Sequence, residues 1–231
     1  MTAVLTPIPT RVSFDLYQMV HKGLRRALFQ SVEIVGQATP SRDDEISAAA
    51  DQVREVVFLL DHHAQHEDAS MDSLIAQYAP GAAARIRVDH QRYDSRIVEI
   101  EQIATRLERA STAVREDVVI ELYRALTDFL PGYLEHMAFE DQVVMPTLAA
   151  ALSVEELIGV QQAIVSSIPP DVNARFMQYM LAAANEDERA TTLAGIREGA
   201  PPEAFAGIAA LTERVVTPTQ WARVAARLDL A

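Results

Sequence analysis

Apolar residues along most of this chain recur three and four positions apart, which places them on one face of an α-helix. Strictly alternating apolar and polar residues, the pattern of a half-buried strand, are almost missing from the sequence. Glycine and proline cluster at a few joints between the long periodic stretches. The pattern predicts an all-α protein.

The N-terminal two thirds of the chain predict four long helices. We expect them over residues 13–36, 44–78, 83–110 and 115–145. Ser13 is a suitable N-cap for the first helix, and Ala79, Pro80 and Gly81 should end the second. Pro131 lacks a backbone donor, so it should kink the fourth helix or split it in two. Four long helices with short connections are typical of an antiparallel up-down four-helix bundle.

Shorter helical units follow the four long ones, and each has a recognisable start signal. These signals lie at Ser153 with Glu156, Pro169 with Pro170, Asn185 with Glu188, Pro201 with Pro202, and Thr217 with Pro218. They predict four or five short helices between residues 153 and 230. We therefore divide the chain into a bundle domain over residues 13–148 and a helical C-terminal extension over residues 153–231.

Charge and composition restrict the partners, the metal ligands and the cellular location that we expect for this protein. The formal net charge is −13, and an acidic surface repels the phosphates of nucleic acids. The chain contains no cysteine, which excludes disulfide bonds and thiolate metal ligands. Its first residues lack the basic start and apolar core of a secretion signal, and no apolar run approaches the ~20 residues that span a bilayer. We expect a soluble cytoplasmic protein with neither nucleic acid nor membrane as a partner.

One short motif, H-x-x-x-E-D, occurs twice in the predicted bundle. It begins at His63, where the sequence reads HAQHED, and again at His136, where it reads HMAFED. Residues i and i+4 share one face of a helix, so each His/Glu pair can bind the same ion. A lone histidine precedes each motif: His21 stands 42 residues before the first and His90 stands 46 residues before the second. The repeat indicates a duplicated helical hairpin with approximate two-fold symmetry.

Convergence of these side chains on the bundle axis would form a dinuclear metal site. Burying several imidazoles and two carboxylates without a cation would cost several kcal/mol per ion. Nitrogen and oxygen donors without sulfur suit iron, manganese or zinc. The predicted ligands are His21, His63, Glu67, His90, His136 and Glu140.

The paired motifs and their lone histidines resemble the hemerythrin-like family, whose domain is also called the HHE cation-binding domain. The resemblance covers residues 13–148. It implies a non-haem centre of two iron ions, Fe(II) or Fe(III), with a bridging oxo or hydroxo group; manganese and zinc are the alternatives. It further implies that Glu67 and Glu140 bridge the ions and that the four histidines are terminal ligands.

The sequence departs from the oxygen-carrying hemerythrins at two places. Those proteins carry H-x-x-x-H on the third helix, whereas Asp94 stands four residues after His90 here. They also carry H-x-x-x-x-D on the last helix, so Asp141 is an alternative partner of His136. The missing imidazole leaves a more open coordination position, which favours redox chemistry over simple oxygen carriage. The ferritin-like motif E-x-x-H does not occur, because no histidine has an acidic residue three positions before it.

Several neighbouring residues have a simpler interpretation. His62 points about 100° away from His63 around the helix, towards solvent or the core. His66 pairs with His62 in a zinc-like H-x-x-x-H or contacts a ligand from outside. Asp68 is either solvated or in contact with a ligand. Three tyrosines near the predicted ligands are expected to pack in the core rather than to bind metal: Tyr17, Tyr93 and Tyr133.

These features predict a cytoplasmic di-iron protein that binds or reacts with dioxygen or peroxide. If it is an enzyme, it decomposes peroxide or activates oxygen for a substrate. One alternative is a module that senses oxygen, nitric oxide or iron without turnover. A second alternative is a helical interaction protein that is metal-free or binds zinc. A homodimer or a redox partner is compatible with each of these hypotheses.

Overall fold

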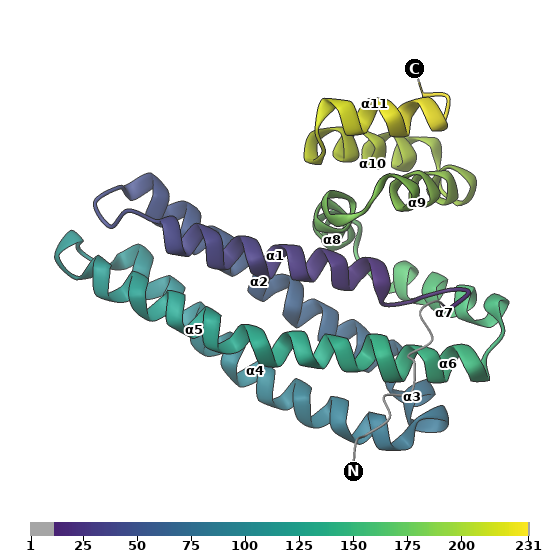
Figure 1. The fold of residues 1–231 in the computed structure, drawn as a ribbon, viewed down its shortest axis with the longest axis horizontal. Helices are drawn as coiled ribbons and strands as arrows, with labels where there is room; N and C mark the ends of the chain where they lie inside the picture. The colour runs from purple at the N-terminus through teal and green to yellow at the C-terminus, as the bar shows by residue number, and fades with distance from the viewer. Residues whose placement is uncertain (1–11, 231) are drawn as a thin grey trace, which may run out of the picture. The chain divides into compact units, whose positions relative to one another are not determined.

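The structure, a computed structural model, describes residues 12–230. Every regular element within that range is a helix, which confirms the all-α prediction (Figure 1). The chain divides into two compact units. Among the described residues, one unit consists of 12–18 and 28–167, and the other of 19–27 and 168–230.

The first unit is built on long helices. They are α1 (Gln18–Gln37), α2 (Asp43–Ser70), α4 (Pro80–Arg109) and α5 (Thr112–Phe139). Figure 1 shows α2, α4, α5 and the half of α1 from Leu28 onward lying side by side. Each helix buries an apolar stripe; on α2 the stripe includes Val53, Val56 and Leu60, which recur at helical spacing. Burial of these stripes is the main stabilising term of the bundle.

Two predicted helix boundaries were wrong. We expected the first helix to begin near Ser13, but α1 begins at Gln18. A carboxylate oxygen of Asp15 accepts hydrogen bonds from the backbone N–H groups of Tyr17 and Gln18, both at 2.9 Å, and so satisfies donors at the helix start. The second predicted helix is broken at Met71, after which α3 (Asp72–Tyr78) begins.

Of the two alternatives predicted for Pro131, a kink or a split, the structure excludes the split, because α5 is continuous to Phe139. Pro131 is exposed, so water can reach the backbone carbonyl that loses its partner. The helical geometry changes instead at η1, a π-helical segment over Glu140–Val144. The chain then continues as α6 (Met145–Ala151), which contains Pro146 near its start.

One end of the first unit is closed by a buried apolar group that we call the end cluster. It includes Tyr17, Met71, Ile75, Val144, Met145 and Leu148. Residues of α7 (Val154–Ser167) pack against the same cluster. The cluster excludes water from that end of the bundle.

The second unit contains four short helices and the first half of α1. The short helices are α8 (Pro170–Ala183), α9 (Glu186–Gly199), α10 (Pro202–Val215) and α11 (Pro218–Arg227). The expected capping box at Asn185 and Glu188 is present, and Thr217 caps α11 together with Gln220. Lys22 on α1 is paired with Glu188 at 2.6 Å. The start signals of the short helices are therefore confirmed.

We predict that Arg189→Ala destabilises the second unit by about 2 kcal/mol. The Arg189 side chain is buried, and it donates hydrogen bonds to the carbonyls of Leu181 at 2.7 Å and Ala182 at 3.3 Å. Its loss would leave carbonyls at the end of α8 without partners. Chemical denaturation followed by circular dichroism measures the change. An unchanged free energy of unfolding for Arg189→Ala would contradict this prediction.

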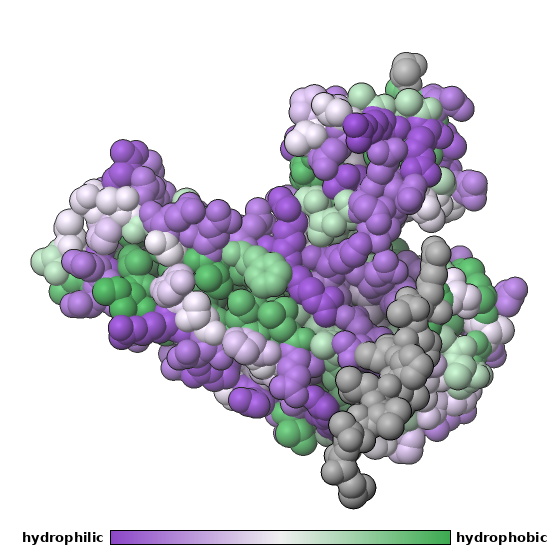
Figure 2. Space-filling view, viewed as in Figure 1, coloured by the Kyte–Doolittle hydropathy of each residue, from purple (hydrophilic) through white to green (hydrophobic). Residues whose placement is uncertain are grey.

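The surface gives no sign of a membrane-crossing segment: none of the described helices is both long and apolar enough. On the face drawn in Figure 2, apolar side chains gather over α1 and α5. Phe29 on α1 and Ile120 on α5 are among the exposed large apolar residues of the first unit. Most of the remaining surface in this view is polar.

Candidate metal centre

The two H-x-x-x-E motifs place their side chains as the helical spacing predicts. His63 and Glu67 lie on α2, with His63 Nε2 at 3.8 Å from Glu67 Oε2. His136 lies near the end of α5 and Glu140 begins η1, with His136 Nε2 at 3.0 Å from Glu140 Oε1. All four side chains are buried. Each pair therefore presents a nitrogen and an oxygen to one interior region.

The lone histidines, His21 on α1 and His90 on α4, are also buried. Two groups of three residues bring their candidate ligand atoms within 4.8 Å of one another. They are His21 with His63 and Glu140, and His90 with His136 and Glu140. Glu140 belongs to both groups, as a bridging ligand would.

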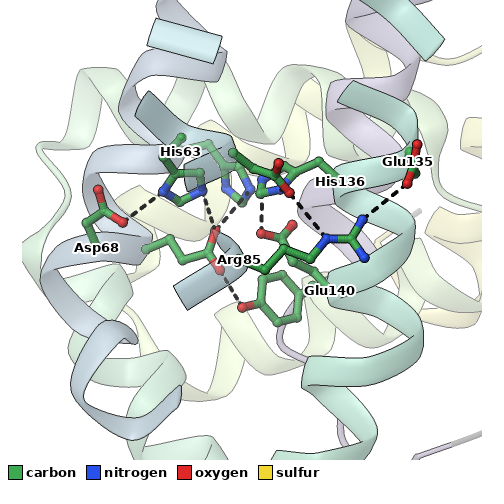
Figure 3. Close-up of polar contacts among 10 residues, drawn as sticks. His63, Asp68, Arg85, Glu135, His136 and Glu140 are labelled. Atoms are coloured by element: carbon green, nitrogen blue, oxygen red, sulfur yellow. Dashed lines mark hydrogen bonds and ion pairs between the residues drawn. The ribbon is translucent and has the colours of Figure 1, made fainter. Parts of the chain in front are cut away.

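Glu67 lies between the two groups without belonging to either. Its Oε2 atom is 3.8 Å from Nε2 of His63 and 3.7 Å from Nε2 of His90. Figure 3 shows the Glu140 carboxylate close to His136, and His63 near the same interior region. The structure thus gathers all six predicted residues.

Several buried atoms of this cluster are suited to bind a cation. Within the described part of the chain, Glu67 Oε2, His90 Nε2 and His136 Nε2 have no hydrogen-bond partner. Buried polar atoms nearly always have a hydrogen-bond partner, because otherwise no interaction offsets the free energy lost when they leave water. Burial, and then the charge of Glu140, raises the pKa of Glu67 well above its ordinary value. A bound divalent ion would give these atoms a partner and would favour the ionised carboxylate of Glu67. The nitrogen and oxygen donors suit iron, manganese or zinc.

Carboxylates contact the outer nitrogens of two histidines. Asp68 Oδ1 lies 2.8 Å from His90 Nδ1, within hydrogen-bond distance. Asp89 Oδ2 lies 3.6 Å from His136 Nδ1, an ion-pair distance that is too long for a hydrogen bond. Arg85 is paired with Asp89 at 3.5 Å and holds it in place. A carboxylate on the outer nitrogen orients a histidine ring and makes it a stronger ligand. Asp68 is therefore in contact with a predicted ligand, which was one of its two expected roles.

Sequence reasoning did not identify Asp89. Its position directly before His90 was the available signal, but its partner His136 is on another helix. The π-helical segment was also unexpected, although it begins at Glu140 itself. Such segments occur frequently at functional sites.

The tyrosines lie around the cluster. The Tyr17 hydroxyl donates a 2.5 Å hydrogen bond to Glu67 Oε1. Tyr93 and Tyr133 each pack on the ring of His136, with centroids 5.5 Å apart in both pairs. Both rings are buried, so they line the cluster with apolar surface.

The remaining candidates stand outside both groups of three. His62 is partly exposed, and its Nδ1 lies 3.0 Å from the carbonyl oxygen of Phe58. His66 and Asp141 are partly buried, and Asp94 is exposed. None of these four residues belongs to a group that brings three ligand atoms together.

Comparison with known proteins identifies the family. The hemerythrin HHE cation-binding domain matches residues 13–159, well over half of the chain. The chain belongs to this family. The match confirms the resemblance seen in the sequence and indicates a helical domain that binds metal cations. Neither the curated proteins nor the solved structures give a match.

The family match also covers the elements that carry the cluster. The HHE domain spans α1 to α6 and the first residues of α7. All six predicted ligands, the end cluster's Tyr17 and the two outer carboxylates, Asp68 and Asp89, fall within it.

Proposed function

We propose that this HHE domain is an antiparallel up-down four-helix bundle that holds two iron ions and binds or reacts with dioxygen or a peroxide in the cytoplasm. Iron, when bound, supplies one-electron redox chemistry towards these oxidants. The observation that carries the proposal is a set of buried ligand atoms that have no hydrogen-bond partner among the described residues: Glu67 Oε2, His90 Nε2 and His136 Nε2.

The chain's own residues would define this chemistry. Glu140 belongs to both groups of three, so its carboxylate would be shared by the ions. His21 and His63 would complete one position, and His90 and His136 the other. The end cluster and the rings of Tyr93 and Tyr133 limit the access of water. A small diatomic or peroxide fits this enclosed setting better than a large organic substrate.

Anaerobic loading with Fe(II) tests the proposal. We expect two ions per chain and, after addition of oxygen, the near-ultraviolet absorption of ferric iron. Peroxide is then added in excess while dissolved oxygen is recorded. Repeated oxygen release indicates a peroxide-decomposing enzyme, whereas a single spectral change indicates binding. A chain that takes up no iron contradicts the proposal.

Sensing without turnover is a second candidate, and one observation favours it. His21 stands in the stretch Met19–Ala27, which packs with the short helices of the second unit. Within that unit, Lys22 is paired with Glu188 at the start of α9. His21 stands next to Lys22, so a change at His21 would reach the start of α9 through the pair of Lys22 with Glu188. Hydrogen exchange of α9 that is the same before and after iron loading would contradict this candidate.

A further inference from the structure

The two acidic residues of the centre differ in their surroundings. Glu140 belongs to both groups of three ligand atoms. Glu67 instead has one oxygen, Oε1, in a 2.5 Å hydrogen bond from the Tyr17 hydroxyl. Its other oxygen, Oε2, is the one near His63 and His90, and it accepts no hydrogen bond within the described residues. The two oxygens of Glu67 therefore have different roles.

The position of Tyr17 is fixed by packing rather than by the metal centre. Tyr17 is only 3% exposed and belongs to the end cluster. Its backbone N–H donates to Asp15, and the neighbouring N–H of Leu16 contacts Met145 Sδ at 3.3 Å. The segment before α1 is thus attached to α6, and it carries the Tyr17 hydroxyl to Glu67.

We propose that Tyr17 is a positioning residue that reserves Glu67 Oε1 and directs Glu67 Oε2 alone at the metal ions. This inference rests on the proposed metal centre and goes beyond it, because it makes the two carboxylates unequal. Glu140 serves both ions, whereas Glu67 contributes a single oxygen. The family resemblance alone implied that Glu67 and Glu140 both bridge the ions, without distinguishing their oxygens.

Metal affinity of Tyr17→Phe tests the proposal. Zn²⁺ is the probe, because it is redox-inert, and a chromophoric chelator competes for it. Loss of a partner that orients a ligand costs about 10–100-fold in affinity, so we expect one ion to bind that much more weakly. The matched control is Tyr78→Phe, which removes a hydroxyl from a residue packed on the same end cluster and should change the affinity less than about two-fold.

A second measurement uses the wild-type protein, in case Tyr17→Phe folds poorly. Proton NMR of tyrosine-labelled protein should show a slowly exchanging Tyr17 hydroxyl in both the metal-free and the zinc-bound states. Rapid exchange of that proton, or equal zinc affinity of Tyr17→Phe and Tyr78→Phe, overturns the role of Tyr17 and leaves the metal centre standing. A wild-type chain that binds no zinc overturns both.

Discussion

Replacing Glu140 with alanine is expected to remove both metal ions from the protein. Glu140 is the only residue common to the two groups of three ligand atoms found in the described part of the chain. Its side chain is completely buried, so solvent cannot replace the lost oxygen without entering a packed interior. Loss of a residue that only orients a ligand lowers metal affinity by ~10–100-fold. Loss of the ligand itself should cost more, so we expect the affinity for each ion to fall at least about 100-fold. Elemental analysis after gel filtration counts the metal.

Two further variants test whether Glu140→Ala loses its ions because a shared ligand is missing or because the fold is disrupted. His90 belongs to one group, so His90→Ala should keep the ion of the other group. His62 lies on the same helix as His63 but belongs to neither group, so His62→Ala should keep both ions. Glu140→Ala with an unchanged metal count would show that the carboxylate is not a ligand.

Metal loading should raise the unfolding temperature of the HHE domain by about 8–16 °C. An ion that binds only the folded state, present at 1,000 times its dissociation constant, adds about 4 kcal/mol of stability. For a domain of this size, each kcal/mol shifts the midpoint by about 2–4 °C. The gain is large because the metal-free protein buries Glu67 and Glu140 next to each other. Differential scanning calorimetry with and without Zn²⁺ measures the shift.

The shift depends on the ligands and should be reversible. A chelator should return the transition to the metal-free temperature, and Glu140→Ala should show no shift on addition of Zn²⁺. Arg189→Ala should keep the full shift, because Arg189 belongs to neither group of three ligand atoms. Equal transition temperatures of the metal-free and metal-loaded wild-type protein would mean that no ion is bound in the interior.

The parts of the site that sequence could predict are those fixed by local geometry. His63 with Glu67, and His136 with Glu140, meet because the helix itself brings residues i and i+4 together. The apolar periodicity around them also predicts which face is buried. The short helices of the second unit were predicted for the same reason, since a capping box such as Asn185 with Glu188 acts within one turn.

The parts that sequence could not predict depend on contacts between distant residues. Tyr17 and Glu67 are 50 positions apart, and Asp89 meets His136 from a different helix. The π-helical geometry at Glu140 is set by how η1 packs, and no residue in EDQVV signals it. The break at Met71 likewise follows from packing, because Met71 is buried in the end cluster while its neighbours continue to form helix.

Lys22, which is paired with Glu188, is the only lysine in the chain and stands next to His21. An amine-reactive reagent would therefore modify a single side chain of this protein. Acylation of Lys22 would neutralise its ammonium group and break the ion pair with Glu188. Glu188 also accepts a hydrogen bond from the backbone N–H of Asn185. A fluorophore attached to this amine would sit one residue from a candidate ligand and report optically on whether the ion is present.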